Sequence, residues 1–128
     1  MKEIVKTEKA PKAIGPYSQA NIIGQFVFTA GQLGIDPQTN QLVKGGIKEE
    51  AEQALKNLGA ILESAGSSFL HVVKCTVFLA DMSEFQLMNE VYKKFFGEDT
   101  PPARSAVQVA KLPLNSRIEI EAIAFIPD

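Results

Sequence analysis

The sequence is poor in the residues on which metal and covalent chemistry most often depend. Its 128 residues include one cysteine (Cys75), one histidine (His71) and no tryptophan. A single cysteine excludes a disulfide within the chain, and one histidine leaves any metal site with carboxylate ligands alone. There is no Gly-rich phosphate loop, nucleophile elbow or Cys–His pair at a catalytic spacing. Covalent and phosphoryl-transfer mechanisms therefore lack support.

Extremes of charge and hydropathy are missing as well. There are 13 Lys and Arg against 15 Asp and Glu, which gives a net charge of -2 and a pI near 5.5, without the basic excess that phosphate-backbone binding needs. No apolar run approaches membrane-spanning length, and residues 1–6 lack the apolar core of a signal peptide. We expect no membrane partner, no nucleic-acid partner, and a reducing cytoplasmic location.

What remains is an ordinary globular composition, with 45% hydrophobic and 22% charged residues. One compact domain, residues 1–128, is expected at this length, and no repeat or linker divides it. Ser83 and Gln86 have capping-box spacing, which predicts a helix that begins there and ends at Gly97. Hydrophobic periodicity predicts strands over 4–5, 17–23, 26–30, 72–79, 104–109 and 117–126, helices over 47–65 and from 83 to 96, and an irregular connection over 31–46.

The last strand indicates how the chain assembles. Its even positions over 118–126 are all apolar, as expected for the face that two helices cover. Its odd positions combine three charged residues with Ile123 and Phe125, and no helix remains in the chain to cover them. We expect this second face to pack against copies of itself in a closed oligomer. The alternative is that loops of the same chain cover its ends.

Two charged residues in apolar strands are the main candidates for chemistry. Arg104 enters a hydrophobic strand just after Pro101 and Pro102. Its planar fork matches a carboxylate, which could belong to a ligand or to an acidic residue on a neighbouring strand. Glu119 lies inside the last strand, where it could orient a water as a base in a half-dry cleft or pair with a Lys or Arg across an interface. The residues alone leave both pairs of alternatives open.

For four other residues a structural role is the simpler interpretation. Tyr17 could form the aromatic wall of a small-ligand pocket or merely pack at a strand edge. Cys75 lies among apolar neighbours, which favours an inert core thiol. His71 has no companion ligand, and Asn89 is a polar residue in an apolar helix that can bond across to a loop or an adjoining chain.

Five short segments are distinctive when taken in order, and they span essentially the whole chain. They are AIGPYSQA at 13–20, AGQ at 30–32, NEVY at 89–92, PARS at 102–105 and IEIEAIA at 118–124. Together they resemble the signature segments of the RidA family, also called YjgF, the reactive-intermediate imine deaminases.

The resemblance implies a fold and an activity. The fold is α+β and chorismate-mutase-like, with a mixed six-stranded sheet, two helices on one face, and a homotrimer whose sheets form a central β-barrel. The ligand clefts lie between subunits. The activity is hydrolysis of 2-imino acids, such as 2-iminopropanoate and 2-iminobutanoate, to the 2-oxo acid and ammonia, and it requires no cofactor.

The resemblance also implies roles for five residues of this chain. Arg104 would grip the substrate carboxylate, and Glu119 would hold the water that attacks the imine carbon. Tyr17 and the backbone around Gly31 would line and orient the pocket, with a contribution from Asn89. This assignment makes physical sense because a protonated imine is already electrophilic and needs placement more than a strong nucleophile.

The chain departs from the family pattern at two positions, with Ala30 where many members have Ser and Ala106 where many have Cys. Two other functions remain possible. One is a ligand-responsive module that captures 2-oxo acids and acts on a partner protein, which would need Arg104 but not Glu119. The other is an endoribonuclease that acts as a translation inhibitor, against which the acidic pI argues.

Overall fold

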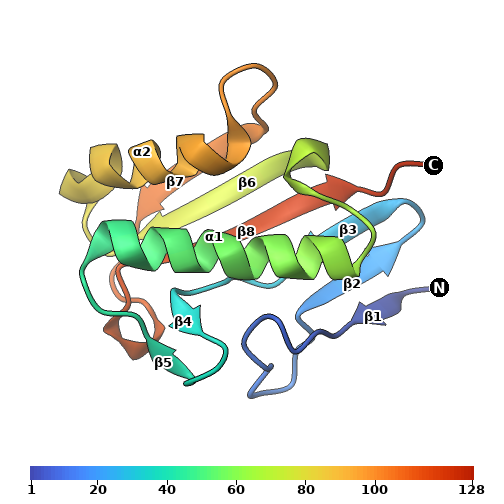
Figure 1. Ribbon diagram of the computed structural model, residues 1–128, viewed down its shortest axis with the longest axis horizontal. Helices are drawn as coiled ribbons and strands as arrows, with labels where there is room; N and C mark the ends of the chain where they lie inside the picture. The colour runs from blue at the N-terminus through green and yellow to red at the C-terminus, as the bar shows by residue number, and fades with distance from the viewer.

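The computed structural model describes all residues, 1–128, and shows a six-stranded sheet with both helices on one side (Figure 1). The strand order is β1-β2-β3-β8-β6-β7, and all pairs are antiparallel except β6 and β7. This confirms the predicted α+β class with a mixed six-stranded sheet. The main elements are β1 (Glu3–Val5), β2 (Ala20–Ile23), β3 (Phe26–Thr29), α1 (Ile47–Ser64), β6 (Val72–Leu79), α2 (Phe85–Phe96), β7 (Ala103–Gln108) and β8 (Ile118–Phe125).

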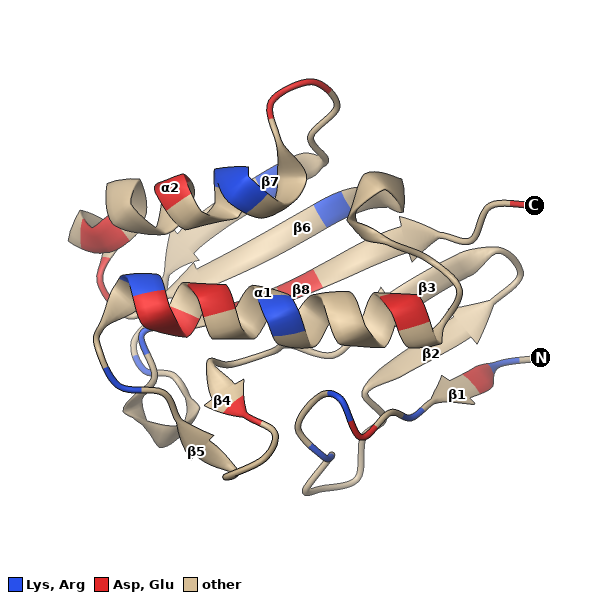
Figure 2. Ribbon diagram, in the orientation of Figure 1, with Lys and Arg blue, Asp and Glu red and all other residues tan.

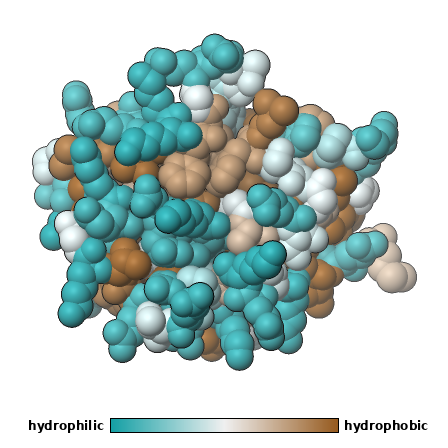
Figure 3. Space-filling model, viewed as in Figure 1, coloured by the Kyte–Doolittle hydropathy of each residue, from teal (hydrophilic) through white to brown (hydrophobic).

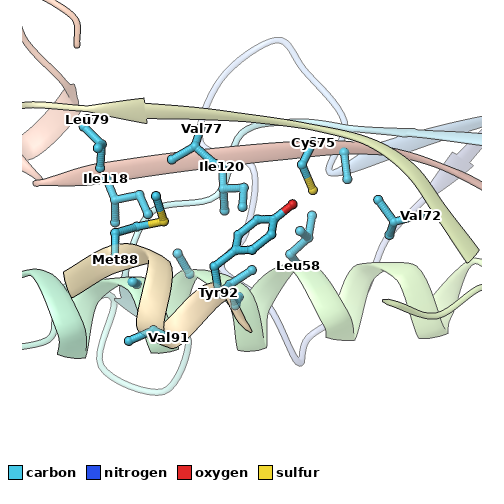
Figure 4. Packing of buried hydrophobic residues seen from close by; sticks show 14 of the residues in the cluster. Leu58, Val72, Cys75, Val77, Leu79, Met88, Val91, Tyr92, Ile118 and Ile120 are labelled. Carbon is cyan, nitrogen blue, oxygen red and sulfur yellow. The ribbon is translucent and has the colours of Figure 1, made fainter. Parts of the chain in front are cut away.

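The core lies between the two helices and the sheet. Helix α1 buries a stripe of apolar residues at steps of three and four, including Leu55, Leu58 and Leu62. These residues pack against the central strands β6 and β8, and α2 adds Met88 and Tyr92 to the same cluster (Figure 4). Helix α2 also makes the crossover that joins the parallel strands β6 and β7.

Strand β8 alternates as the sequence predicts. Ile118, Ile120 and Ala124 are fully buried under the helices, whereas Glu119 and Glu121 lie half-buried on the opposite side. The surface on the helical side is mostly hydrophilic (Figure 3). No helix of the chain covers the opposite side (Figure 1), and large apolar residues remain exposed on it. We call this side the open face; by strand register it carries Ile23, Phe26, Phe28, Lys74, Phe78, Val107, Glu119, Glu121, Ile123 and Phe125.

Three local predictions were wrong. Ser83 does not cap α2; instead Asp81 Oδ1 accepts a hydrogen bond of 2.9 Å from Ser83 N, which caps the 3-10 turn η2 (Met82–Glu84) ahead of the helix. The first strand of the hairpin begins at Ala20 rather than at residue 17. The connection over 31–46 contains a small separate hairpin, β4 (Ile35–Asp36) with β5 (Gln41–Leu42).

None of the helices combines the length and the apolar character that a membrane crossing requires.

Candidate functional site

A surface cleft of about 650 Å³ opens beside the start of β8. The N-terminal loop over 11–19 forms one wall, residues 30–35 after β3 form the floor, and the turn η3 (Pro113–Asn115) forms the opposite rim. Three of the five residues that the resemblance singles out line this cleft together, namely Tyr17, Gly31 and Glu119. The sequence places them far apart, and the sheet brings them together.

One buried side chain holds the N-terminal loop in place. The amide of Gln19 is 4% exposed. Its Oε1 accepts a hydrogen bond of 2.7 Å from Thr7 N, and its Nε2 donates to Pro11 O at 2.8 Å and to Thr7 O at 3.1 Å. These bonds satisfy backbone groups that no strand or helix pairs, and so they fix the wall that carries Tyr17. Gln19 lies in the distinctive 13–20 segment, but nothing in the sequence pattern predicts this structural role.

Gly31 and Glu119 approach each other more closely than any other residue type would allow. Residue 32 bridges to β8, with Gln32 N donating to Ile120 O at 2.8 Å and Ile120 N donating to Gln32 O at 3.0 Å. This bridge sets Gly31 directly against Glu119. A Cβ on Gly31 would lie 2.4 Å from Glu119 Oε2, so the absence of a side chain at this position is what leaves room for the carboxylate.

Glu119 has a raised pKa and no cationic partner in its own chain. Burial raises its pKa above the ordinary value, and the nearby charge of Glu121 raises it further. No Lys or Arg of the same chain forms an ion pair with it, and the alternative of a partner across an interface stays a prediction. A half-buried carboxylate with a raised pKa in a cleft is typical of a general base.

Arg104 is a half-buried cation without an anionic partner. Its only side-chain hydrogen bond is from Nη1 to Asn89 Oδ1, at 2.6 Å. No Asp or Glu lies within ion-pair distance, so the proposed ion pair to a neighbouring strand is not found. A guanidinium has five donors in a fixed fork, and no buried nitrogen of Arg104 is left unpartnered, so its remaining donors reach solvent. Such a group suits an anionic ligand.

Arg104 and Asn89 do not line the cleft that Tyr17, Gly31 and Glu119 share. Arg104 stands beside Cys75 in register, on the helical side of the sheet, whereas Glu119 stands on the open face. One chain therefore presents the predicted site residues as two separate groups.

The remaining candidates are structural. Cys75 is fully buried, and burial raises the pKa of its thiol to about 11, which suits an inert core residue. His71 Nδ1 lies 3.0 Å from Ser68 Oγ, and its ring packs edge-on against Phe125. No group of three or more His, Cys, Asp or Glu side chains is placed to hold a metal ion.

Known proteins share both the sequence and the fold of this chain over nearly its whole length. The human 2-iminobutanoate/2-iminopropanoate deaminase is 54% identical over 97% of this chain and 90% of its own length. A crystal structure of a Thermotoga maritima protein superposes with a TM-score of 0.96 at 56% identity, covering 100% of both chains. The structure of E. coli TdcF with bound serine gives a TM-score of 0.91 at 45% identity, covering 96% of this chain and 98% of TdcF.

Residues 7–126 match the family described as Endoribonuclease L-PSP. The chain belongs to this family, also known as RidA or YjgF, as its five signature segments predict.

Proposed function

We propose that this chain hydrolyses 2-imino acids, such as 2-iminopropanoate and 2-iminobutanoate, to 2-oxo acids and ammonia. The observation that carries the proposal is the half-buried guanidinium of Arg104, which has no carboxylate partner in a chain of this family. A 2-imino acid supplies that carboxylate. The human relative that shares 54% of its residues with this chain bears the name of this activity.

The two groups of residues divide the reaction between them. Arg104 binds the carboxylate in two parallel hydrogen bonds and so fixes the imine carbon. Glu119 accepts a proton from a water as its oxygen adds to the carbon of the protonated imine, and the C=N bond becomes a single bond. Glu119 gives this proton to the nitrogen of the resulting amino alcohol. The C–N bond then breaks as the C=O bond forms, Glu119 accepts the hydroxyl proton and passes it to the released ammonia, and no cofactor takes part.

A second copy of the chain completes the site in this proposal. Arg104 does not line the cleft of its own chain, and the open face leaves Phe26, Phe28 and Val107 between 43% and 48% exposed. A sheet with such a face is stabilised when copies cover it. We therefore propose a homotrimer with a central β-barrel, in which Arg104 of one copy faces the cleft of the next. The cytoplasmic location stays a prediction.

The deciding experiment measures turnover of an unstable imine. A pyridoxal-phosphate dehydratase generates 2-iminobutanoate from threonine in the cuvette, and purified protein is added at increasing amounts. We expect release of the 2-oxo acid to accelerate in proportion to the protein. Release at the uncatalysed rate at every protein concentration would refute the proposed function.

The trimer can be tested separately by light scattering after size exclusion. We expect a mass of three times the 13.9 kDa chain. Phe28→Asp places a charge in the centre of the open face and should dissociate the trimer, with loss of turnover, because a buried unpaired carboxylate is costly. Leu70→Asp introduces the same charge at a leucine that is 70% exposed outside the open face, and it should leave the mass unchanged. A monomeric wild type would contradict the proposal.

Gly31→Ala should impair turnover without unfolding the protein. The new Cβ would overlap the Glu119 carboxylate, whose flexible end can swing away, so the melting temperature should stay nearly constant. The displaced carboxylate no longer orients water, and we expect kcat/KM to fall by about tenfold to a hundredfold. Gly15→Ala is the matched control, since its Cβ would lie at an ordinary 3.6 Å from Tyr17. Equal losses in both variants would contradict the assigned role of Gly31.

The family description names an endoribonuclease, which is the alternative function that the acidic pI disfavours. RNA binding rests on cations that neutralise phosphates. The net charge is -2, and acidic and basic residues interleave along α1 (Figure 2). We expect any ribonuclease activity of a preparation to disappear on further purification while imine turnover remains.

A further inference from the structure

Three residues on one side of α2 surround the guanidinium of Arg104. Phe85, Asn89 and Tyr92 follow an i, i+4, i+7 spacing and therefore share a helix face. Arg104 Cζ lies 5.2 Å from the centre of the Phe85 ring and 4.6 Å from the centre of the Tyr92 ring. With the bond to Asn89, three of the groups around the guanidinium come from one rigid element.

The rings hold the guanidinium without using its donors. A cation over a ring face is attracted by the ring quadrupole, whereas its N–H groups point outward in the guanidinium plane. Asn89 takes one of the five donors. The two aromatic contacts take none, so the edge that would bind a carboxylate stays free.

Packing against the core fixes both aromatic residues, Tyr92 as a buried member of the core cluster and Phe85 as a partly buried residue beside it. Tyr92 is 6% exposed, its ring packs 4.4 Å from that of Phe96, and its hydroxyl end points toward Cys75 (Figure 4). Phe85 packs against the same core cluster. The ring faces that contact Arg104 therefore move little. Because they are fixed, they restrict the movement of the Arg104 guanidinium.

We propose that Phe85 and Tyr92 are positioning residues that hold the Arg104 guanidinium flat, with its free edge ready for the substrate carboxylate. The inference rests on the proposed function, and it assigns a positioning role to one core residue, Tyr92, and to the partly buried Phe85. An arginine free to rotate loses rotamer freedom when it binds a ligand. Here packing removes that freedom before the substrate arrives, so the benefit appears as tighter binding rather than as faster chemistry.

Phe85→Leu tests this inference because leucine keeps an apolar side chain at the position but removes the ring. We expect KM for 2-iminobutanoate, and Kd for the product 2-oxobutanoate by calorimetry, to rise about three- to tenfold. kcat should stay within about twofold. Phe85→Tyr restores an aromatic face and should bring both constants back to within about twofold of the wild type.

Phe95→Leu is the matched control. Phe95 lies on the same helix, packs against the same cluster, and contacts Phe69 at 5.5 Å rather than Arg104. It should lower the melting temperature by a similar amount and leave KM and Kd unchanged. In an Arg104→Ala background, Phe85→Leu should weaken 2-oxobutanoate binding by less than about twofold further, because nothing is left to position.

The outcomes separate this inference from the proposed function. An active wild type in which Phe85→Leu and Phe95→Leu have equal KM values would overturn the positioning role alone. A wild type that binds 2-oxobutanoate without turning over any imine would overturn the proposed function, while the Kd comparison would still decide the positioning role. A Phe85→Leu effect on kcat with no effect on KM would also contradict the inference.

Discussion

Arg104→Ala is expected to lower kcat/KM for 2-iminobutanoate by between about 30-fold and several thousandfold. The truncation removes a charge-assisted, bidentate contact to the substrate carboxylate, which is worth about 2–5 kcal/mol. Arg104→Lys keeps the charge but loses the planar fork and its stacking on Phe85 and Tyr92, so it should fall between the wild type and the alanine variant. The assay is 2-oxo acid release from an enzymatically generated imine.

The fold should survive the substitution at Arg104. Its side chain makes one hydrogen bond and no ion pair, so its loss leaves no buried charge unpaired. We expect the alanine variant to keep the wild-type circular dichroism spectrum and oligomeric mass. Lys111→Ala makes the same change in net charge at an exposed residue after β7 and should retain full turnover. Full activity of Arg104→Ala would rule out the proposed mechanism.

The arrangement of helices and strands could be predicted from the sequence because buried apolar residues recur at regular spacings along each element. The strict alternation of β8 identifies its buried face, and the three-and-four spacing of α1 identifies its buried stripe. Features that depend on one hydrogen bond were missed. Ser83 and Gln86 satisfy a capping-box spacing, yet the Asp81 carboxylate caps the preceding turn first, and the spacing alone does not distinguish these two outcomes.

The β-bulge in strand β6 is another feature that the sequence pattern does not reveal. Simple alternation groups Val73 with Cys75 and Val77, but the register shifts between Val72 and Lys74, so Val72 is buried and Val73 is 42% exposed. An inserted residue reverses the faces on one side of it, and nothing in a β-branched run marks where it occurs.

The site was accessible only in part, because its residues come from elements whose register the sequence does not reveal. Arg104 and Glu119 were singled out as charges in apolar strands, but that they face opposite sides of the sheet follows from the pairing of β7 and β8 with β6. Phe85 packs against the core like the other apolar residues of α2, and that pattern alone does not reveal its contact with Arg104. Gly31 owes its importance to a steric contact with a residue 88 positions later.

Glu119→Gln is expected to abolish turnover while leaving ligand binding intact. Glutamine keeps the size and polarity of the side chain but does not accept the proton of the attacking water, so kcat should fall by about 10²- to 10⁴-fold. Kd for 2-oxobutanoate should change by less than about threefold, because Arg104 makes the principal contact. Unchanged turnover in this variant would favour a ligand-responsive binding module over an enzyme.

The pH dependence of kcat/KM provides an independent test of Glu119. The base must be ionised, and burial together with the charge of Glu121 raises its pKa above the ordinary 4.5, so activity should begin to fall at a pH above that value as the solution is acidified. Glu121→Gln removes the repelling charge, which lowers the pKa of Glu119 and should move this acid limb to lower pH. Burial still raises the pKa of Glu119 in this variant, so the acid limb should stay at a higher pH than an exposed glutamate would give. Glu63→Gln, the same charge change on the exposed side of α1, should leave the profile where it is; an equal shift in both variants would show that overall charge, and not the neighbour of Glu119, controls the limb.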